Sequence, residues 1–246
     1  MSTKEDISVS IGIILFSNLT QLDFTAPYEV FSRLPNTKLY LLAETLEPIS
    51  SDRGLIVLPN TTFAQAPKLD VLFVPGGPGV NAKMEDQSFL DFLKTQEEQA
   101  RYVTSVCTGS LLLAAAGLLT GYRATTHWLS LNVLELLGVE VVRERVVIDR
   151  NRITGGGVTA GIDFGLAIAA ELFTEAMSTT GYAYAQEIQL AIEYNPQPPF
   201  NSGSPQTAPP SITARVQAAS QKFQASRRQI VQRLLDKQTQ NTDSPQ

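Results

Sequence analysis

The hydrophobic positions of this chain fall into short continuous runs separated by amphipathic stretches. Apolar runs of this length predict buried strands, because a parallel strand is covered on both faces; they occupy residues 9–16, 38–43, 70–74 and 103–106. Helical spacing of apolar residues predicts helices at residues 24–34, 87–101, 130–137 and 160–172. The alternation predicts an α/β fold with a doubly wound, mostly parallel sheet flanked by helices.

The remaining segments predict edge strands of the sheet and a C-terminal extension of the domain. Residues 55–59 and 61–63 read as a hairpin or as edge strands. Gly138 is placed to end the helix predicted at residues 130–137. Residues 195–210 are rich in Pro, Ser, Asn and Gly and predict a loop, followed by a polar helix at 211–237. We therefore expect one α/β domain over residues 1–194, extended by a Pro-rich loop and C-terminal helix over 195–246.

Composition narrows the classes of function. The 246 residues carry 19 Lys and Arg against 24 Asp and Glu, a formal charge of −5, which argues against nucleic-acid binding. One Cys and one His cannot build a Cys/His metal cage or an internal disulfide. The polar N-terminus shows no signal peptide, and the apolar stretch at 111–119 is too short for a bilayer. We expect a cytoplasmic protein that binds neither nucleic acid nor membrane.

The single cysteine, Cys107, lies where a β-branched strand meets an Ala- and Leu-rich helix. Such a strand-to-helix turn resembles a nucleophile elbow, which lifts the attacking atom out of the backbone. The positive end of the helix should favour the thiolate and lower the pKa of Cys107. The alternative is a buried cysteine that acts as a small hydrophobe.

Two other segments end a strand in glycine, at Gly76-Gly77 and at residues 155–157. Ligands of doubly wound sheets bind at the carboxyl ends of the strands, so these turns and the elbow can converge on one site. The amides of Gly77 and Thr108 would form an anion-binding pair, and the Thr108 hydroxyl can donate to the thiolate or cap the helix. The alternative for Gly76 and Gly77 is a tight turn without function.

Asp23 follows the first strand and precedes the helix predicted at residues 24–34, with Pro27 in its first turn. As a functional residue it would exchange protons with a substrate held by Cys107, and burial would raise its pKa. As a structural residue it would be an N-cap.

The only histidine, His127, is at least as well explained by a supporting hydrogen bond as by a role as general base. Asp163 reads as a helix-initiating residue.

Four segments together resemble the DJ-1/PfpI superfamily of the class I glutamine amidotransferase-like fold. They are the Pro-Gly-Gly turn, the Val-Cys-Thr-Gly-Ser elbow, Gly-Tyr-Arg-Ala-Thr-Thr-His-Trp and Gly-Gly-Gly-Val-Thr-Ala-Gly-Ile-Asp-Phe. Gln-Leu-Asp-Phe-Thr-Ala-Pro and the Pro-rich tail are most similar to bacterial isocyanide hydratases. The resemblance implies a flavodoxin-like homodimer that hydrates a small isocyanide to a formamide without a cofactor or metal.

Carried over by motif, the resemblance implies roles for individual residues. Cys107 would be the nucleophile and Asp23 the general acid/base, while Thr108 and the Gly77 amide would belong to the substrate-binding shell. Beyond the resemblance, we expect Thr108 to take part in catalysis and Gly76 and His127 to lie at the substrate site.

Other members of the superfamily place a glutamate beside the cysteine or pair it with histidine. An aspartate at position 23 therefore argues against glyoxalase, deglycase, amidase and protease activities, without excluding them. The elbow also resembles the sensor domains of AraC-type regulators, but residues 211–246 are too few for their DNA-binding module. A third alternative is a redox sensor in which Cys107 is oxidised.

Overall fold

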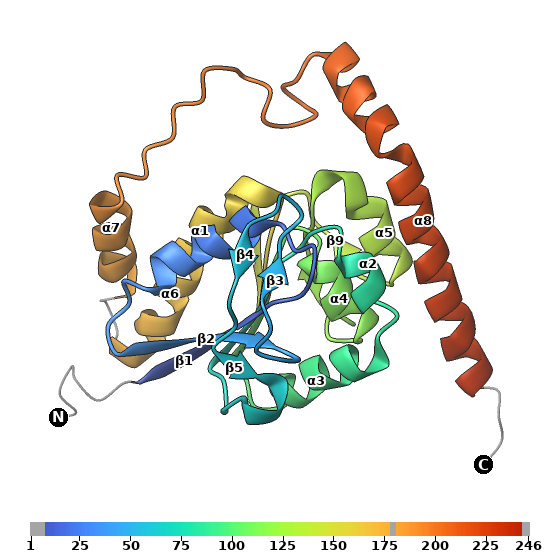
Figure 1. The fold of residues 1–246 in the computed structure, drawn as a ribbon. Helices are drawn as coiled ribbons and strands as arrows, with labels where there is room; N and C mark the ends of the chain where they lie inside the picture. Colours follow the sequence, from blue (N-terminus) through green and yellow to red (C-terminus); the bar gives the residue numbers. More distant parts are fainter. Residues whose placement is uncertain (1–7, 178–180, 243–246) are drawn as a thin grey trace.

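A seven-stranded sheet forms the centre of the protein (Figure 1). The computed structural model describes residues 8–177 and 181–242. The strands follow the order β10-β11-β7-β6-β1-β2-β5, and β10 pairs antiparallel with β11 while the other pairs are parallel. Their bounds are β1 Val9–Ile14, β2 Thr37–Ala43, β5 Thr61–Thr62, β6 Val71–Val74, β7 Tyr102–Val106, β10 Val146–Asp149 and β11 Arg152–Gly155. The predicted doubly wound, mostly parallel sheet is confirmed.

The order of the strands reverses between β1 and β6. From β1 the chain proceeds outward to β2 and β5, then returns to β6 and continues through β7 to β11. Every residue of β6 and β7 is buried, which explains their continuous apolar and β-branched sequence. The carboxyl ends of β1, β6 and β7 therefore open at the switch point, where this class of fold binds ligands.

Helices cover both faces of the sheet (Figure 1). One layer holds α1 (Gln21–Phe31), α6 (Gly161–Met177) and α7 (Gly181–Ala191), and Phe31, Phe73 and Phe164 pack their rings together beneath it. The other layer holds α2 (Val80–Lys83), α3 (Gln87–Glu97), α4 (Gly109–Ala115) and α5 (Leu131–Leu136). The sequence did not predict α7.

Short elements complete the α/β unit. Two small ladders pair β3 (Ile49–Ser50) with β4 (Ile56–Val57), and β8 (Arg123–Ala124) with β9 (Glu140–Val141). Three 3-10 turns are η1 (Phe63–Gln65), η2 (Trp128–Ser130) and η3 (Val158–Ala160). The segments expected as a hairpin or edge strands are not a hairpin with each other, because β4 pairs with β3 and β5 lies at the sheet edge beside β2.

The C-terminal part forms a loop and a long helix, α8 (Pro210–Thr242). The loop leaves α7, passes over the molecule and reaches the start of α8 on the opposite side of the sheet (Figure 1). There α8 packs against α5 and η2, with Val231 fully buried. None of the helices that the structure describes is long and apolar enough to cross a membrane.

Candidate active site

Cys107 lies at a strained turn between β7 and α4. Its φ of +53° is in the left-handed region, which costs a non-glycine residue about 1–3 kcal/mol. Its amide donates to the carbonyl oxygens of Gly155 at 3.0 Å and Gly156 at 2.8 Å. Its own carbonyl oxygen accepts hydrogen bonds from Thr126 Oγ1 at 2.8 Å and Ser110 Oγ at 3.2 Å. The elbow expected from the sequence is present, and hydrogen bonds on both sides hold its conformation.

The turn after β6 approaches the elbow so closely that side chains are excluded. A Cβ atom on Gly109 would lie 2.1 Å from the carbonyl oxygen of Val74. A Cβ atom on Gly76 would lie 2.5 Å from the Thr108 amide nitrogen and 2.9 Å from Asp23 Oδ2. Glycine at these positions lets the turn after β6, the elbow and the Asp23 side chain approach one another. The sequence had left open whether Gly76 serves such a close approach or only a tight turn.

Asp23 is fully buried beside the elbow. Its Oδ2 accepts a hydrogen bond from the Gly76 amide at 3.0 Å. Within residues 8–177 and 181–242, its Oδ1 is buried without a hydrogen-bond partner. Burial raises the pKa of Asp23 to about 7, against the lowering effects of the Cys107 thiol and the Gly76 amide, and the negative charge of Asp52 adds to the rise. The expected rise in pKa is confirmed, and the carboxyl group can hold a proton near neutral pH.

The helix that carries Asp23 begins earlier than predicted. Because α1 starts at Gln21, Asp23 lies in its first turn, and Thr20 occupies the N-cap position. The N-cap alternative for Asp23 is therefore wrong, since its carboxylate bonds across to the β6 turn. Pro27 lies inside the helix rather than in its first turn, and having no amide hydrogen it cannot donate to the Asp23 carbonyl.

The expectation that the pKa of Cys107 falls below its ordinary value is wrong. Burial of the thiol raises its pKa well above that value, and the negative charge of Asp23 adds to the rise. The Thr108 amide and the charge of Arg227 act in the opposite direction. The start of a seven-residue helix does not outweigh the loss of hydration. Cys107 and Asp23 are therefore coupled through their proton rather than independently ionised.

Thr108 links the elbow to the glycine turn. The Gly77 amide donates to Thr108 Oγ1 at 3.0 Å, while the amide of Thr108 faces the sulfur of Cys107. The two amides thus do not form the anion-binding pair expected from the sequence, because the Gly77 amide is taken by the hydroxyl. The hydrogen bond from the Gly77 amide fixes the position of the Thr108 hydroxyl oxygen. The hydroxyl in turn donates only a weak hydrogen bond to the Gly77 carbonyl oxygen, at 3.4 Å.

His127 makes its hydrogen bond away from the thiol. Its Nδ1 accepts from the Leu129 amide at 3.3 Å, and its ring lies against Gly157 and Trp128. Burial and the nearby charge of Arg227 lower its pKa, so it is neutral at pH 7. Of this segment, Thr126 rather than His127 contacts the elbow through a hydrogen bond in the described structure.

Asp163 lies in the first turn of α6, as expected for a residue that starts a helix. Its Oδ2 accepts from Arg145 Nε at 2.5 Å and from the Tyr194 hydroxyl at 2.9 Å. It has no hydrogen bond to the elbow in the described structure.

Sequence reasoning missed Arg227, a buried cation on α8. Its guanidinium hydrogen-bonds to Asn81 and Ser130 and lies 4.7 Å from the ring centre of Phe223. Its helical neighbours Phe223, Ile230 and Val231 are apolar, so Arg227 occupies a position where the 3.6-residue period predicts a hydrophobic residue. A charged residue on the apolar face of this helix was the one sign in the sequence that could have identified Arg227.

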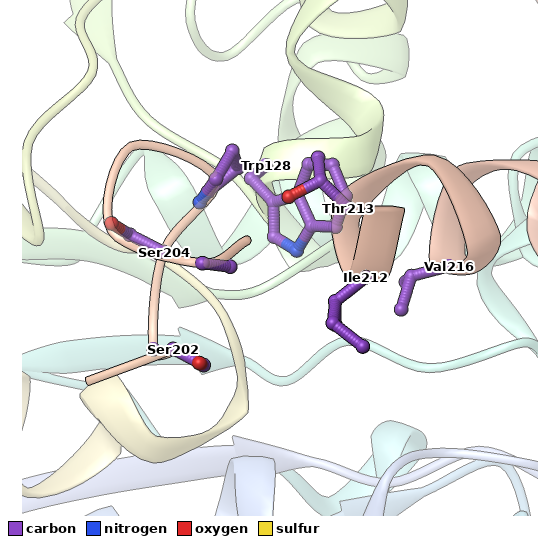
Figure 2. A pocket seen from close by; sticks show the side chains of 9 residues that line it. Trp128, Ser202, Ser204, Ile212, Thr213 and Val216 are labelled. Atoms are coloured by element: carbon purple, nitrogen blue, oxygen red, sulfur yellow. The ribbon is translucent and has the colours of Figure 1, made fainter. Parts of the chain in front are cut away.

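A separate pocket of about 150 Å³ lies where the Pro-rich loop meets α8 (Figure 2). Trp128 forms one wall, Ser202 and Ser204 lie on the loop, and Ile212 and Val216 come from the first turns of α8. Its lining includes none of the elbow residues. Among the described residues, no group of three His, Cys, Asp or Glu side chains could hold a metal ion.

Comparisons with known proteins agree with this arrangement. The model of the DJ-1/PfpI family matches residues 9–171. An isonitrile hydratase from Pseudomonas putida is 52% identical over 215 residues, 87% of this chain and 91% of that protein. The crystal structure of a ThiJ/PfpI family protein from Pseudomonas syringae has a TM-score of 0.85 and 41% identity, covering 91% of this chain and 90% of that one. The HTH-type transcriptional regulator GbdR of Pseudomonas aeruginosa is 34% identical over 163 residues, 63% of this chain but 44% of the regulator.

Proposed function

The chain belongs to the DJ-1/PfpI family, and we propose that it hydrates isocyanides to N-substituted formamides through Cys107 and Asp23. The observation that carries the proposal is the buried pair itself. A thiol at a strained elbow lies beside a carboxyl group whose pKa is about 7 and whose Oδ1 accepts no hydrogen bond among the described residues. The identity to an isonitrile hydratase supports the choice of substrate class.

In the first half of the reaction, the Cys107 sulfur attacks the terminal carbon of R–N≡C. A carbon–sulfur bond forms as one π electron pair of the N≡C bond moves onto the nitrogen, and the lone pair that the terminal carbon already carries takes a proton from Asp23. The product is a thioimidate, R–N=CH–S–Cys107, with Asp23 left as the carboxylate. Nucleophile and acid must act together, and both lie in the site.

In the second half, Asp23 takes a proton from water as the water oxygen bonds to the same carbon. Asp23 then passes this proton to the nitrogen. The adduct, R–NH–CH(OH)–S–Cys107, collapses as the carbon–sulfur bond breaks and the hydroxyl proton moves to Asp23. The formamide R–NH–CHO leaves, and the thiolate and the protonated carboxyl group are restored.

The neighbouring residues receive supporting roles. Because the Thr108 hydroxyl accepts from Gly77, its proton is available to a substrate nitrogen, which makes the terminal carbon more electrophilic. Gly76 holds Asp23 through its amide. His127 belongs to the outer wall of the substrate site in this proposal and transfers no proton in the reaction.

The proposed function is tested by offering the purified protein an alkyl isocyanide and methylglyoxal side by side. Proton NMR should show the formamide C–H signal growing with time, and methylglyoxal should be consumed at the rate of a protein-free control. Rapid loss of methylglyoxal with no formamide would replace the hydratase by a glyoxalase.

A regulatory sensor domain is the second candidate, because GbdR matches this chain over the α/β part. The C-terminal residues that the structure describes form one long helix that packs on α5 and η2 rather than a helix-turn-helix module. We therefore propose that the protein does not bind DNA, which a filter-binding assay at physiological salt would check.

Three further proposals concern organisation. We propose that residues 195–246 are an extension of the α/β domain, because α8 buries Val231 and Arg227 against it. We propose a homodimer, because Tyr182 and Leu190 on α7 and Phe200 on the loop expose large apolar side chains. Light scattering after gel filtration would test the dimer.

A cytoplasmic, reducing compartment is proposed because the reaction requires a free thiol.

A further inference from the structure

One buried cation, Arg227, is hydrogen-bonded to segments that lie beside the elbow and has no carboxylate partner among the described residues. The guanidinium of Arg227 is 2% exposed. Its Nε donates to Asn81 Oδ1 at 2.8 Å, and its Nη1 donates to Ser130 Oγ at 2.9 Å. Both acceptors are neutral, and no carboxylate among residues 8–177 and 181–242 forms an ion pair with it. An unpaired charge is costly to bury, so a negative charge within range would stabilise Arg227.

The two partners of Arg227 belong to the segments that hold the elbow. Asn81 comes four residues after Gly77, whose amide donates to Thr108. Ser130 comes four residues after Thr126, whose hydroxyl donates to the Cys107 carbonyl. Arg227 thus joins α8 to α2 and η2, the elements that follow the two segments hydrogen-bonded to the elbow.

The charged groups around Cys107 come from four parts of the chain. Asp23 on α1 and Asp52 after β3 are acidic, and His127 before η2 is kept neutral by burial. Arg227 is the positive charge that acts on the Cys107 sulfur. The groups that shift the pKa of Asp23 are Cys107, Gly76 and Asp52.

Resting on the function proposed above, we propose that Arg227 is a positioning residue that acts through Cys107. Its charge offsets part of the effect of burial on the sulfur, and so makes it easier for the Cys107–Asp23 pair to adopt the form with the negative charge on the sulfur and the proton on the carboxyl group. This is the form that begins the reaction, because the sulfur must attack while Asp23 still has a proton to give. The third member of the site therefore comes from α8, outside the segment matched by the family model.

The test measures the alkylation of Cys107 by iodoacetamide as a function of pH. Cys107 is the only cysteine, so the rate reports on this thiol alone. Replacing Arg227→Gln should raise the midpoint of the pH profile by about one unit and slow alkylation at pH 7 about tenfold. Arg227→Lys should keep the wild-type midpoint to within a few tenths of a unit, since the charge is retained.

Matched variants separate the charge from the packing. Asn81→Asp is isosteric, keeps the hydrogen bond and neutralises Arg227 with a carboxylate, so it should raise the midpoint as Arg227→Gln does even if that variant folds poorly. Asn81→Ala removes the hydrogen bond but leaves the charge, and should lower the melting temperature without moving the midpoint. Arg233→Gln, on the same helix and paired with Glu85 at 2.9 Å, should change neither.

An unchanged midpoint in both Arg227→Gln and Asn81→Asp would overturn the inference, as would an equal rise in Asn81→Ala. The readout uses no isocyanide, so it is independent of the proposed reaction. A shifted midpoint in a protein that leaves isocyanides unchanged would contradict the proposed function alone. Formamide production with an unmoved midpoint would contradict the role of Arg227 alone.

Discussion

At the elbow, backbone geometry decides which residues can be present, whereas along α8 a single side chain decides what the helix contributes. Glycine at positions 76 and 109 and a left-handed cysteine are conditions for the strands to meet. On α8, by contrast, Arg227 is the buried charge on a helix whose other charged residues are largely exposed. The elbow therefore supplies the reacting atoms, and α8 supplies part of the electric field around them.

The same contrast separates the segment that this chain shares with its family from the loop and helix that follow that segment. The family model covers residues 9–171, which include Cys107, Asp23 and both glycine turns. The loop and α8 follow this segment, and α8 packs against α5 and η2 (Figure 1). Changes at the elbow should stop the reaction, and changes along α8 should adjust the charge at the sulfur or the stability of the domain.

The largest graded effect is expected from Asp23→Asn. Asn can still accept from the Gly76 amide but cannot carry the proton, so kcat should fall by about 10²–10⁴-fold. The measurement is the rate of formamide formation under saturating isocyanide. A variant within threefold of the wild type would remove Asp23 from the mechanism.

Asp23→Asn should also be more stable than the wild type at pH 8. The folded-state pKa is about 7 and the ordinary value 3.8, so the folded protein binds more protons between about pH 4 and 7 and loses stability as pH rises through this range. Asn avoids this cost, which is on the order of 4 kcal/mol above pH 7. Thermal unfolding at pH 4 and pH 8 should show a gain at pH 8 only, and an equal gain at both would contradict the assignment.

Thr108→Val should have the next largest effect. It leaves the Gly77 amide without its acceptor, at about 1–3 kcal/mol, and removes the hydroxyl proposed to bond the substrate nitrogen. We expect kcat/KM to fall about 10²-fold. Thr108→Ser, which keeps the hydroxyl, is the control and should recover most of the loss; equal losses in the two variants would exclude the hydroxyl.

Val231→Ala on α8 should affect stability alone. Val231 is fully buried against the α/β part, so its truncation should cost about 2 kcal/mol. If residues 195–246 are part of one domain, the variant should unfold in a single transition at a lower melting temperature and keep the wild-type kcat. Two separate transitions would indicate that α8 unfolds independently.

Much of the fold could be predicted because the buried strands are marked by local sequence. The runs that became β1, β6 and β7 consist mainly of apolar or β-branched residues, as expected for parallel strands covered on both faces. The start of α1 was placed three residues late, because Gln21 and Leu22 carry no start signal that distinguishes them from a loop. The helix α7 has a weak amphipathic pattern and was not predicted.

The site was predicted where its residues are marked by neighbours in sequence and missed where they are not. Cys107 is flanked by a strand, a helix and Gly109, so the elbow was visible. The direction of its pKa was wrong, because burial depends on the whole fold. Arg227 was missed because its partners Asn81 and Ser130 are 146 and 97 residues away along the chain.

The central claim is that the Cys107 sulfur performs the attack on the isocyanide. The most direct test compares the wild type with Cys107→Ala in the same alkyl isocyanide assay, after unfolding curves have established that the variant is folded. We predict formamide production by the wild type and none above the protein-free rate by Cys107→Ala. Turnover by the folded variant at a rate near that of the wild type would contradict the account.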